Sequence, residues 1–154
     1  MHRTSIALVM AAVTAVTATQ RLIAQTPDVM FPVHQFVDGF NKGDTRSMLA
    51  ACAAQTSIID EFPPHEWSGA GACGRWIADF DQYSKKNGIT ETVVTLGKPL
   101  HVDVTGDRAY VVIPSDYAFK ANGKPDKESG SLFTFVLQRG ATSWRIIGWS
   151  WAKH

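Results

Sequence analysis

Four ionisable side chains fall within one short stretch of the chain. Asp60, Glu61, His65 and Glu66 flank two prolines, whose rings fix their own φ angles. Carboxyl and imidazole groups can accept and donate protons when their pKa lies near neutral pH. The run before Asp60 is apolar and needs burial, so the chain leaves the core where the titratable groups begin. Loops on a rigid scaffold often carry chemistry, which makes this stretch the first candidate for a pocket rim.

Asp60 is the first candidate for a general base. Asp60 and Glu61 are adjacent, so in an extended chain their side chains point to opposite faces and at most one enters a cavity. Apolar neighbours at Ile58, Phe62 and Trp67 are expected to raise the pKa of the Asp60 carboxyl. The sequence leaves a second interpretation open, in which this carboxylate only accepts hydrogen bonds from the backbone around the two prolines.

His65 is the second catalytic candidate. It follows the two prolines and precedes Glu66, so the loop holds it rigidly. An imidazole beside carboxylates suits proton transfer. The alternative is an exposed or hydrogen-bonded side chain, which is the commoner state of a lone loop histidine.

Asp116 interrupts an otherwise apolar strand. A buried carboxylate without a partner is costly, so Asp116 must face solvent, a partner or a pocket. Pro114 indicates a sheet edge or a bulge, and bulges are frequent near binding sites. Tyr110 and Tyr117 lie on opposite faces of this strand, and either hydroxyl is a candidate donor to a ligand. We predict that Asp116 and Tyr117 contact a ligand.

The chain contains five tryptophans, many for its length. In a regular strand Trp149 and Trp151 share a face with Ile147, whereas Trp144 lies on the other face. Core filling and a dimer face form the preferred interpretation, and an aromatic-lined ligand pocket is the second. The aromatic candidates for that pocket are Phe36, Phe62, Trp67 and Trp76.

Hydrophobic periodicity separates an N-terminal helical part from a C-terminal strand part. Apolar residues recur every three or four positions, which predicts helices over residues 29–41, 44–53 and 73–86. From residue 89 the period changes to two, with turn residues between the runs. This predicts strands over residues 89–96, 100–105, 108–120, 128–139 and 143–151. The order indicates an α+β domain with helices on one face of an antiparallel sheet.

This arrangement resembles the nuclear transport factor 2-like (NTF2-like) superfamily, which includes ketosteroid isomerase and the SnoaL-like polyketide cyclases. The resemblance covers residues 29–151 and is carried by a helix pair ending in Asn41-Lys42-Gly43-Asp44, a short strand, a third helix and a long meander. It implies a cone-shaped fold, with three N-terminal helices packed on a strongly curved antiparallel sheet. It also implies a cavity at the wide end and a homodimer formed through the sheet. Activities vary widely within such a scaffold.

The isomerase motif is only partly present. By this resemblance the general-base aspartate corresponds to Asp60, the helix-1 tyrosine to Phe36, and the second oxyanion donor to a position near Ser131. Isomerisation needs a base together with donors for the developing enolate oxygen. The loss of both donors argues against that reaction and leaves Asp60 as a cavity residue.

The N-terminus has the order of a secretory signal peptide. A basic start precedes an apolar run over residues 6–18, which is too short to span a membrane, and a polar stretch follows. Cleavage is expected after Ala18 or Ala24. We predict a signal peptide over residues 1–24, a single domain over residues 25–154, and a periplasmic or secreted location.

Two cysteines, Cys52 and Cys73, fall in the exported part. An oxidising compartment favours a disulfide between them, which on the chain-entropy model stabilises by about 3 kcal/mol. The alternative is two buried thiols. A tetrahedral zinc site needs four ligands. Two cysteines with only His65 between them are too few for such a site of the usual kind. We therefore predict no metal and no cofactor.

The charges are balanced and dispersed. The chain has 15 basic and 14 acidic residues and a formal net charge of +1. Nucleic-acid and membrane-surface partners need a clustered basic patch, so neither is predicted. The resulting hypothesis is an exported protein that binds a small apolar or amphipathic molecule, with acid–base chemistry of the isomerase, cyclase or dehydratase type. The alternative is a non-catalytic dimerisation or interaction module whose cavity is filled.

Overall fold

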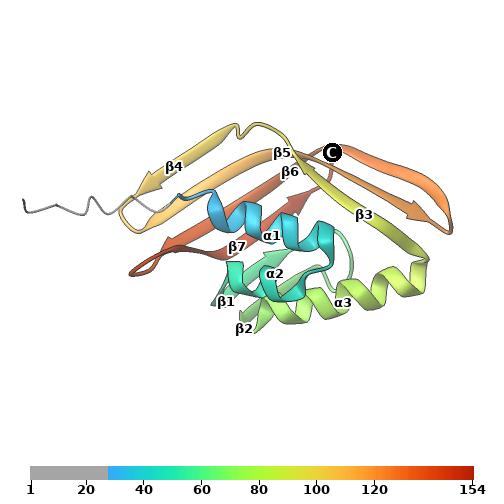
Figure 1. Cartoon of the computed structure of the whole chain (residues 1–154), viewed down its shortest axis with the longest axis horizontal. Helices are drawn as coiled ribbons and strands as arrows, with labels where there is room; N and C mark the ends of the chain where they lie inside the picture. The colour runs from blue at the N-terminus through green and yellow to red at the C-terminus, as the bar shows by residue number, and fades with distance from the viewer. Residues whose placement is uncertain (1–27) are drawn as a thin grey trace, which may run out of the picture.

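Three helices pack against the concave face of one strongly curved sheet (Figure 1). The computed structural model describes residues 28–154, so the predicted signal peptide lies outside the described residues. The α+β class and the arrangement of three helices on a curved sheet are confirmed. Within residues 28–154, no helix is both long and apolar enough to cross a bilayer.

The first two helices are delimited by local sequence signals. α1 (Phe31–Lys42) carries Pro32 in its first turn, where the missing N–H has no intrahelical partner to lose. The Asp44 side chain accepts a hydrogen bond from the Ser47 N–H over 3.0 Å and caps α2 (Thr45–Ala51). The two helices therefore end and restart at the turn that the sequence indicates.

The sheet has seven strands in the order β2-β1-β7-β6-β5-β3, and β4 pairs with the free part of β5. Neighbours are antiparallel except β1 and β7, which run parallel. The sheet is therefore mixed, although the long C-terminal meander is antiparallel as predicted. The strands are β1 (Cys52–Ile59), β2 (Glu66–Ala70), β3 (Ile89–Leu96), β4 (His101–Thr105), β5 (Arg108–Ala121), β6 (Lys124–Arg139) and β7 (Trp144–Ala152).

A bulge in β7 corrects one prediction. The register with β6 skips Ile147, because Leu137 pairs with Ile146 and the next pair is Val136 with Gly148. An extra residue reverses the alternation of side chains along a strand. Trp144 therefore lies on the concave face with Trp149, and both belong to the buried core.

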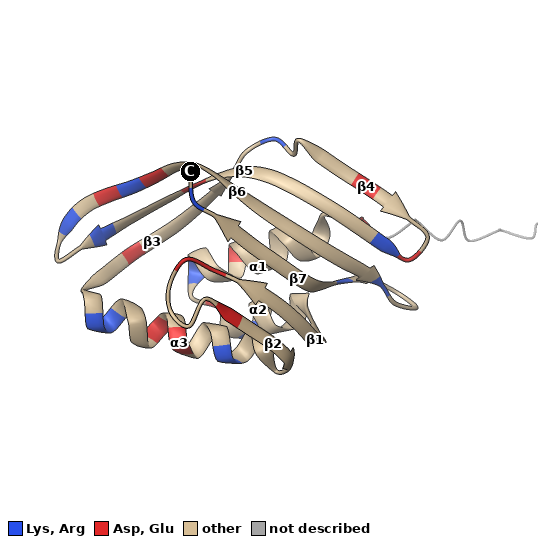
Figure 2. Ribbon diagram, turned by 180° about the vertical axis from the view of Figure 1, so that it is seen from behind, with Lys and Arg blue, Asp and Glu red and all other residues tan. Residues whose placement is uncertain are grey.

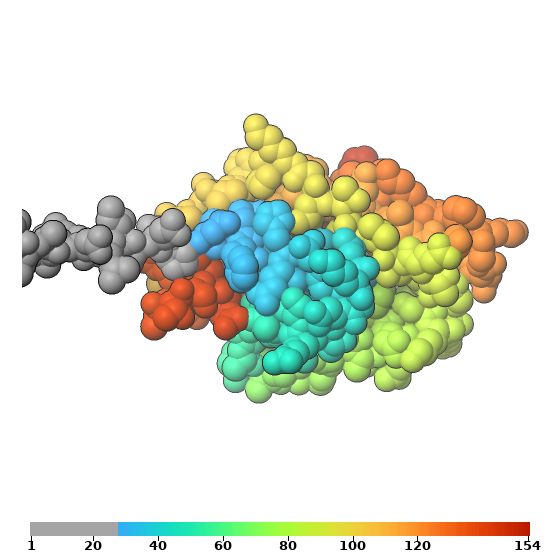
Figure 3. Space-filling view, in the orientation of Figure 1, coloured from blue at the N-terminus to red at the C-terminus, as the bar shows by residue number. Residues whose placement is uncertain are grey.

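The core lies between the helices and the concave face. α3 (Ala72–Asn87) follows β2, and α1, α2 and α3 together cover this side of the sheet in the space-filling view (Figure 3). Cys52 and Cys73 form the predicted disulfide, which joins the start of β1 to the first turn of α3. The start of β1 and the first turn of α3 are thereby held together. The largest fully buried side chains include Phe36, Ile58, Ile113, Phe135, Leu137 and Ile146.

Candidate functional site

A cavity of about 320 Å³ lies between α1, α3 and the concave face of the sheet. Its wall is mostly aromatic, and its charged lining residues are Asp60, Glu61 and Lys153. Ligand sites in proteins usually combine apolar walls with a few placed polar groups. The aromatic residues of the wall include Phe36, Phe62, Trp76, Tyr117, Trp149 and Trp151.

Asp60 is held at the cavity wall by two hydrogen bonds. Its Oδ2 accepts from the indole Nε1–H of Trp76 over 2.7 Å, and its Oδ1 accepts from the backbone N–H of Glu61 over 2.7 Å. Asp60 comes directly after β1, and Trp76 lies near the start of α3. The two elements joined by the disulfide therefore also position this carboxylate.

Burial raises the pKa of Asp60 to about 6, because the loss of hydration outweighs the hydrogen bonds from Trp76 and Glu61. A carboxyl with this pKa is mostly ionised at pH 7 and still binds a proton readily. General acid–base catalysis is most effective when the pKa lies near the working pH. Asp60 is therefore suited to accept a proton from a bound molecule and return it.

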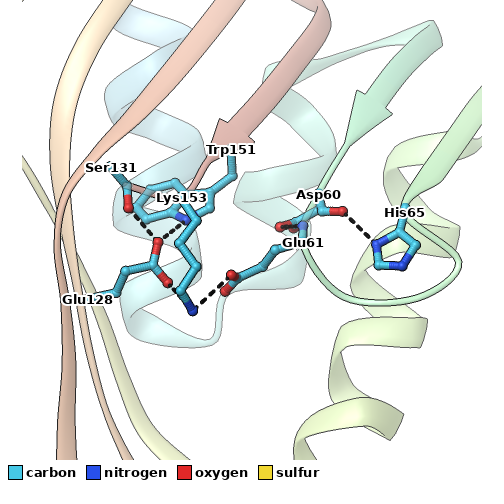
Figure 4. Close-up of polar contacts among 7 residues, drawn as sticks. All are labelled: Asp60, Glu61, His65, Glu128, Ser131, Trp151 and Lys153. Carbon is cyan, nitrogen blue, oxygen red and sulfur yellow. Dashed lines mark hydrogen bonds and ion pairs between the residues drawn. The ribbon is translucent and has the colours of Figure 1, made fainter.

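His65 lies outside the cavity wall. It adopts φ 72°, and its exposed ring places Nδ1 3.2 Å from the backbone oxygen of Asp60, as Figure 4 shows. The Asp60 N–H donates to the His65 carbonyl over 3.0 Å. These contacts close the loop that carries Asp60, and a catalytic role for His65 stays a prediction.

Two hydrogen-bond donors of the wall have no partner among the described residues. The Tyr117 hydroxyl and the Trp149 Nε1–H are both buried and unpaired there. Burial, with the nearby carboxylates of Glu61 and Asp60, raises the pKa of Tyr117, so its hydroxyl stays protonated. Buried polar groups are nearly always paired, so these two donors are candidates for hydrogen bonds to a bound molecule. Tyr117 was a sequence candidate, whereas nothing in the sequence singled out Trp149 as a donor.

A second polar group, which we call the rim cluster, consists of Glu61, Glu128 and Lys153. The Lys153 ammonium lies 3.1 Å from Glu61 and 3.2 Å from Glu128 (Figure 4). Glu128 also accepts hydrogen bonds from the Ser131 hydroxyl and, over 2.7 Å, from the Trp151 Nε1–H. Ser131, which the resemblance placed near an oxyanion donor, thus points its hydroxyl at Glu128.

The charges of the rim cluster depend on one another. Hydrogen bonds to Glu61 and Glu128 raise the pKa of Lys153, so its amine stays protonated and is not a nucleophile. Burial raises the pKa of Glu61. Burial also acts to raise the pKa of Glu128, but its hydrogen bonds from Ser131, Trp151 and Lys153 outweigh this effect and lower it. The sequence did not identify this cluster, because its three members come from separate elements.

Two predicted ligand contacts lie outside the cavity wall. The Trp67 Nε1–H donates to the Asp79 carboxylate over 2.8 Å, and the ring is buried in the core. Asp116 forms an ion pair with Lys127 over 2.9 Å. This contact, with a hydrogen bond from the Gly130 N–H, lowers the pKa of Asp116. Both side chains connect neighbouring elements, whereas the predicted residues Phe36, Phe62, Trp76 and Tyr117 do meet in the wall.

Metal-binding side chains are not grouped in the part of the chain that the structure describes. No set of three or more His, Cys, Asp or Glu residues there is placed to hold a metal ion. The polar chemistry of the cavity wall rests on carboxylates, an ammonium group, a phenol and indoles. These groups support proton transfer and hydrogen bonding.

Comparison with known proteins identifies the family. The family model of the SnoaL-like domain matches residues 29–150. No curated protein matches the chain. Among solved structures, a proposed dehydratase of the NTF2-like family from Streptomyces avermitilis is similar, with TM-score 0.66 and 20% identity over 82% of this chain and 94% of that one.

Two further solved structures share the fold. A ketosteroid isomerase-like protein from Erwinia carotovora atroseptica has TM-score 0.64 and 13% identity over 88% of this chain and 98% of that one. An NTF2-like superfamily protein from Salmonella enterica has TM-score 0.67 and 15% identity over 81% of this chain and 87% of that one. At these identities the structures demonstrate the shared fold alone. The chain therefore belongs to the SnoaL-like domain family, and it shares the fold of NTF2-like proteins.

Proposed function

We propose that this protein binds a small apolar or amphipathic molecule in the aromatic cavity and that Asp60 exchanges a proton with it. The observation that carries the proposal is a buried carboxyl with a pKa of about 6 in the wall of a cavity of about 320 Å³. Similar structures include a proposed dehydratase and a ketosteroid isomerase-like protein, and both reaction types move protons. Isomerisation, cyclisation and dehydration are the reaction classes that this arrangement supports.

Three polar groups of the wall have roles in this proposal. Asp60 accepts a proton from a carbon next to a carbonyl group, and the electron pair of the broken C–H bond moves to the carbonyl oxygen. The Tyr117 hydroxyl and the Trp149 indole N–H donate hydrogen bonds to that oxygen as its negative charge develops. Asp60 then returns the proton to another atom of the product. These two donors substitute for those that the isomerase motif lacks at Phe36 and Ser131.

The test compares the parent with Asp60→Asn against a metabolite library. A bound ligand stabilises the folded protein by an amount that grows with the logarithm of its concentration over its Kd, about 2.7 kcal/mol at a hundred times Kd, and the melting temperature rises accordingly. We expect the hits to stabilise both proteins, and turnover only with the parent. Asp81→Asn, on the exposed side of α3, is the matched control. Turnover that survives Asp60→Asn would exclude the proton-transfer role.

We also propose that the mature protein is exported. The disulfide between Cys52 and Cys73 supports this, because disulfides persist mainly in oxidising compartments. Measuring the intact mass of protein from the exported fraction tests export and cleavage. Export predicts the loss of the N-terminal segment after Ala18 or Ala24, and full-length protein retained in the cytoplasm would refute it.

A non-catalytic homodimer is the second candidate, favoured by the outer face of the sheet. Figure 2 shows that the middle of β5, β6 and β7 carries few charged residues on this side. Large apolar side chains are exposed there: Ile59, Tyr110, Leu132 and Val136. Light scattering of the parent and of Val136→Lys tests this face. A dimer that the substitution dissociates supports the proposal, whereas a monomeric parent excludes it.

A further inference from the structure

The rim cluster places two carboxylates around one ammonium at the cavity wall. We propose that the natural ligand carries a protonated amine on an apolar body, and that its ammonium binds between Glu61 and Glu128 in the position that Lys153 occupies. The inference rests on the proposed function, because it needs a ligand in the aromatic cavity. It adds the chemical class of that ligand.

The Glu128 carboxylate and the Glu61 backbone are held independently of Lys153, whereas the Glu61 carboxylate is paired with Lys153. Glu128 is fixed by hydrogen bonds from the Ser131 hydroxyl and the Trp151 indole, and its side chain is only 7% exposed. Glu61 follows Asp60, whose side chain is bonded to the Glu61 backbone N–H. A site whose acceptors are already oriented loses less entropy when it binds a cation.

The Lys153 side chain, in contrast, can move away from the two carboxylates into water. It is 60% exposed, and the residue follows the last residue of β7. The pair with Glu61, which is 34% exposed, contributes little to stability, whereas the Glu128 carboxylate is buried and needs a cation beside it. The ammonium of Lys153 thus shows where a cation fits, and a ligand ammonium there would replace its charge.

The surroundings favour a cation over an anion. A carboxylate ligand would meet Asp60 and Glu61, and the single cation of the wall is already bound to two carboxylates. Like charges at such distances disfavour binding.

A second observation indicates that the cavity takes a ligand at all. Trp149 is 4% exposed and lines the cavity, and its buried indole N–H has no partner among residues 28–154. A buried donor of this kind is expected to have an acceptor when the site is filled. The rim cluster would then hold one end of the molecule and the inner wall its body.

Three probes of equal chain length separate charge from apolarity: octylamine, octanol and octanoate. Binding is measured by calorimetry and by tryptophan fluorescence at about pH 7.5, where the amine and the carboxylate are both charged. We expect octylamine to bind more tightly than octanol, and octanoate to bind weakest, with about tenfold between the charged probes.

Variants locate the effect. Lys153→Ala frees both carboxylates. It is expected to raise the affinity for octylamine about tenfold and to leave the affinity for octanol unchanged. Glu128→Gln keeps an acceptor for Ser131 and Trp151 but removes the charge, and is expected to weaken octylamine about tenfold. Lys85→Ala is the control, since Lys85 forms an exposed pair with Asp81 on α3 and its loss changes net charge equally.

The outcomes are distinct. If octanol binds but octanoate binds more tightly than octylamine, and Lys153→Ala abolishes octanoate binding, the rim is an anion site and the amine inference is wrong while the cavity proposal stands. If octylamine binds and both rim variants leave its affinity unchanged, the ammonium lies elsewhere and the inference also fails. If none of the three binds, both proposals fail.

Discussion

The indole N–H of Trp76 donates to the carboxylate of Asp60 over 2.7 Å, and this bond links α3 to the end of β1. The same indole stacks on Phe80 with ring centroids 5.4 Å apart. Trp76 therefore connects the aromatic wall with the carboxyl that we propose as the base. The predictions below follow from this pair and from the groups around it.

Trp76→Phe is expected to raise the pKa of Asp60 above its value of about 6. The indole hydrogen bond stabilises the charged carboxylate, so its removal favours the protonated form. Phenylalanine keeps an aromatic ring against Phe80. Carboxyl-carbon NMR titration measures the change, and an unchanged Asp60 midpoint would show that the bond has no influence.

The ionisation of Asp60 is expected to make the stability of the fold depend on pH. Its pKa is about 6 in the folded chain and ordinarily 3.8 for an aspartate side chain, so the folded state binds more protons than the unfolded state between these values. The free energy of unfolding should therefore fall as pH rises from about 4 to about 6, by up to about 3 kcal/mol from this group.

Asp60→Asn removes that dependence. We expect denaturation midpoints of this variant to exceed those of the parent above about pH 6 and to approach them near pH 4. Urea unfolding at several pH values measures both curves. A parent whose stability stays level across this range would contradict the raised pKa.

Tyr117→Phe should separate stability from binding. The Tyr117 hydroxyl is buried without a partner among the described residues, so its removal should leave stability unchanged or raise it by about 1 kcal/mol. The affinity for cyclohexanone, whose oxygen accepts hydrogen bonds, should fall by about tenfold because one neutral hydrogen-bond donor is lost. Tyr110→Phe, on the exposed outer face, should change neither quantity. Equal effects of the two substitutions would remove Tyr117 from the site.

The disulfide should stabilise the elements that carry the site. Cys52 and Cys73 are 21 residues apart, and replacing both with serine should cost about 3 kcal/mol on the chain-entropy model. Denaturant unfolding under oxidising conditions measures the loss. Two free thiols in the intact mass of exported, non-reduced protein would contradict the bond.

The sequence alone determined the features that depend on neighbouring residues. Helical and strand periods located three helices and the five strands of the meander, because burial of one face imposes a repeat on each element. Asp44 marked the start of α2, and Asp60 marked the point where the chain leaves the core. The cysteines also indicated their own pairing, since only two are present.

Only the tertiary structure decided the features that depend on register and on contacts between distant elements. The bulge at Ile147 turned Trp144 to the concave face, which no period of two reveals. The short strand β2 and the parallel pairing of β1 with β7 depend on partners far along the chain. Glu61, Glu128 and Lys153 meet because β1, β7 and β6 are neighbours in the sheet, and a linear pattern of residues does not encode that strand order.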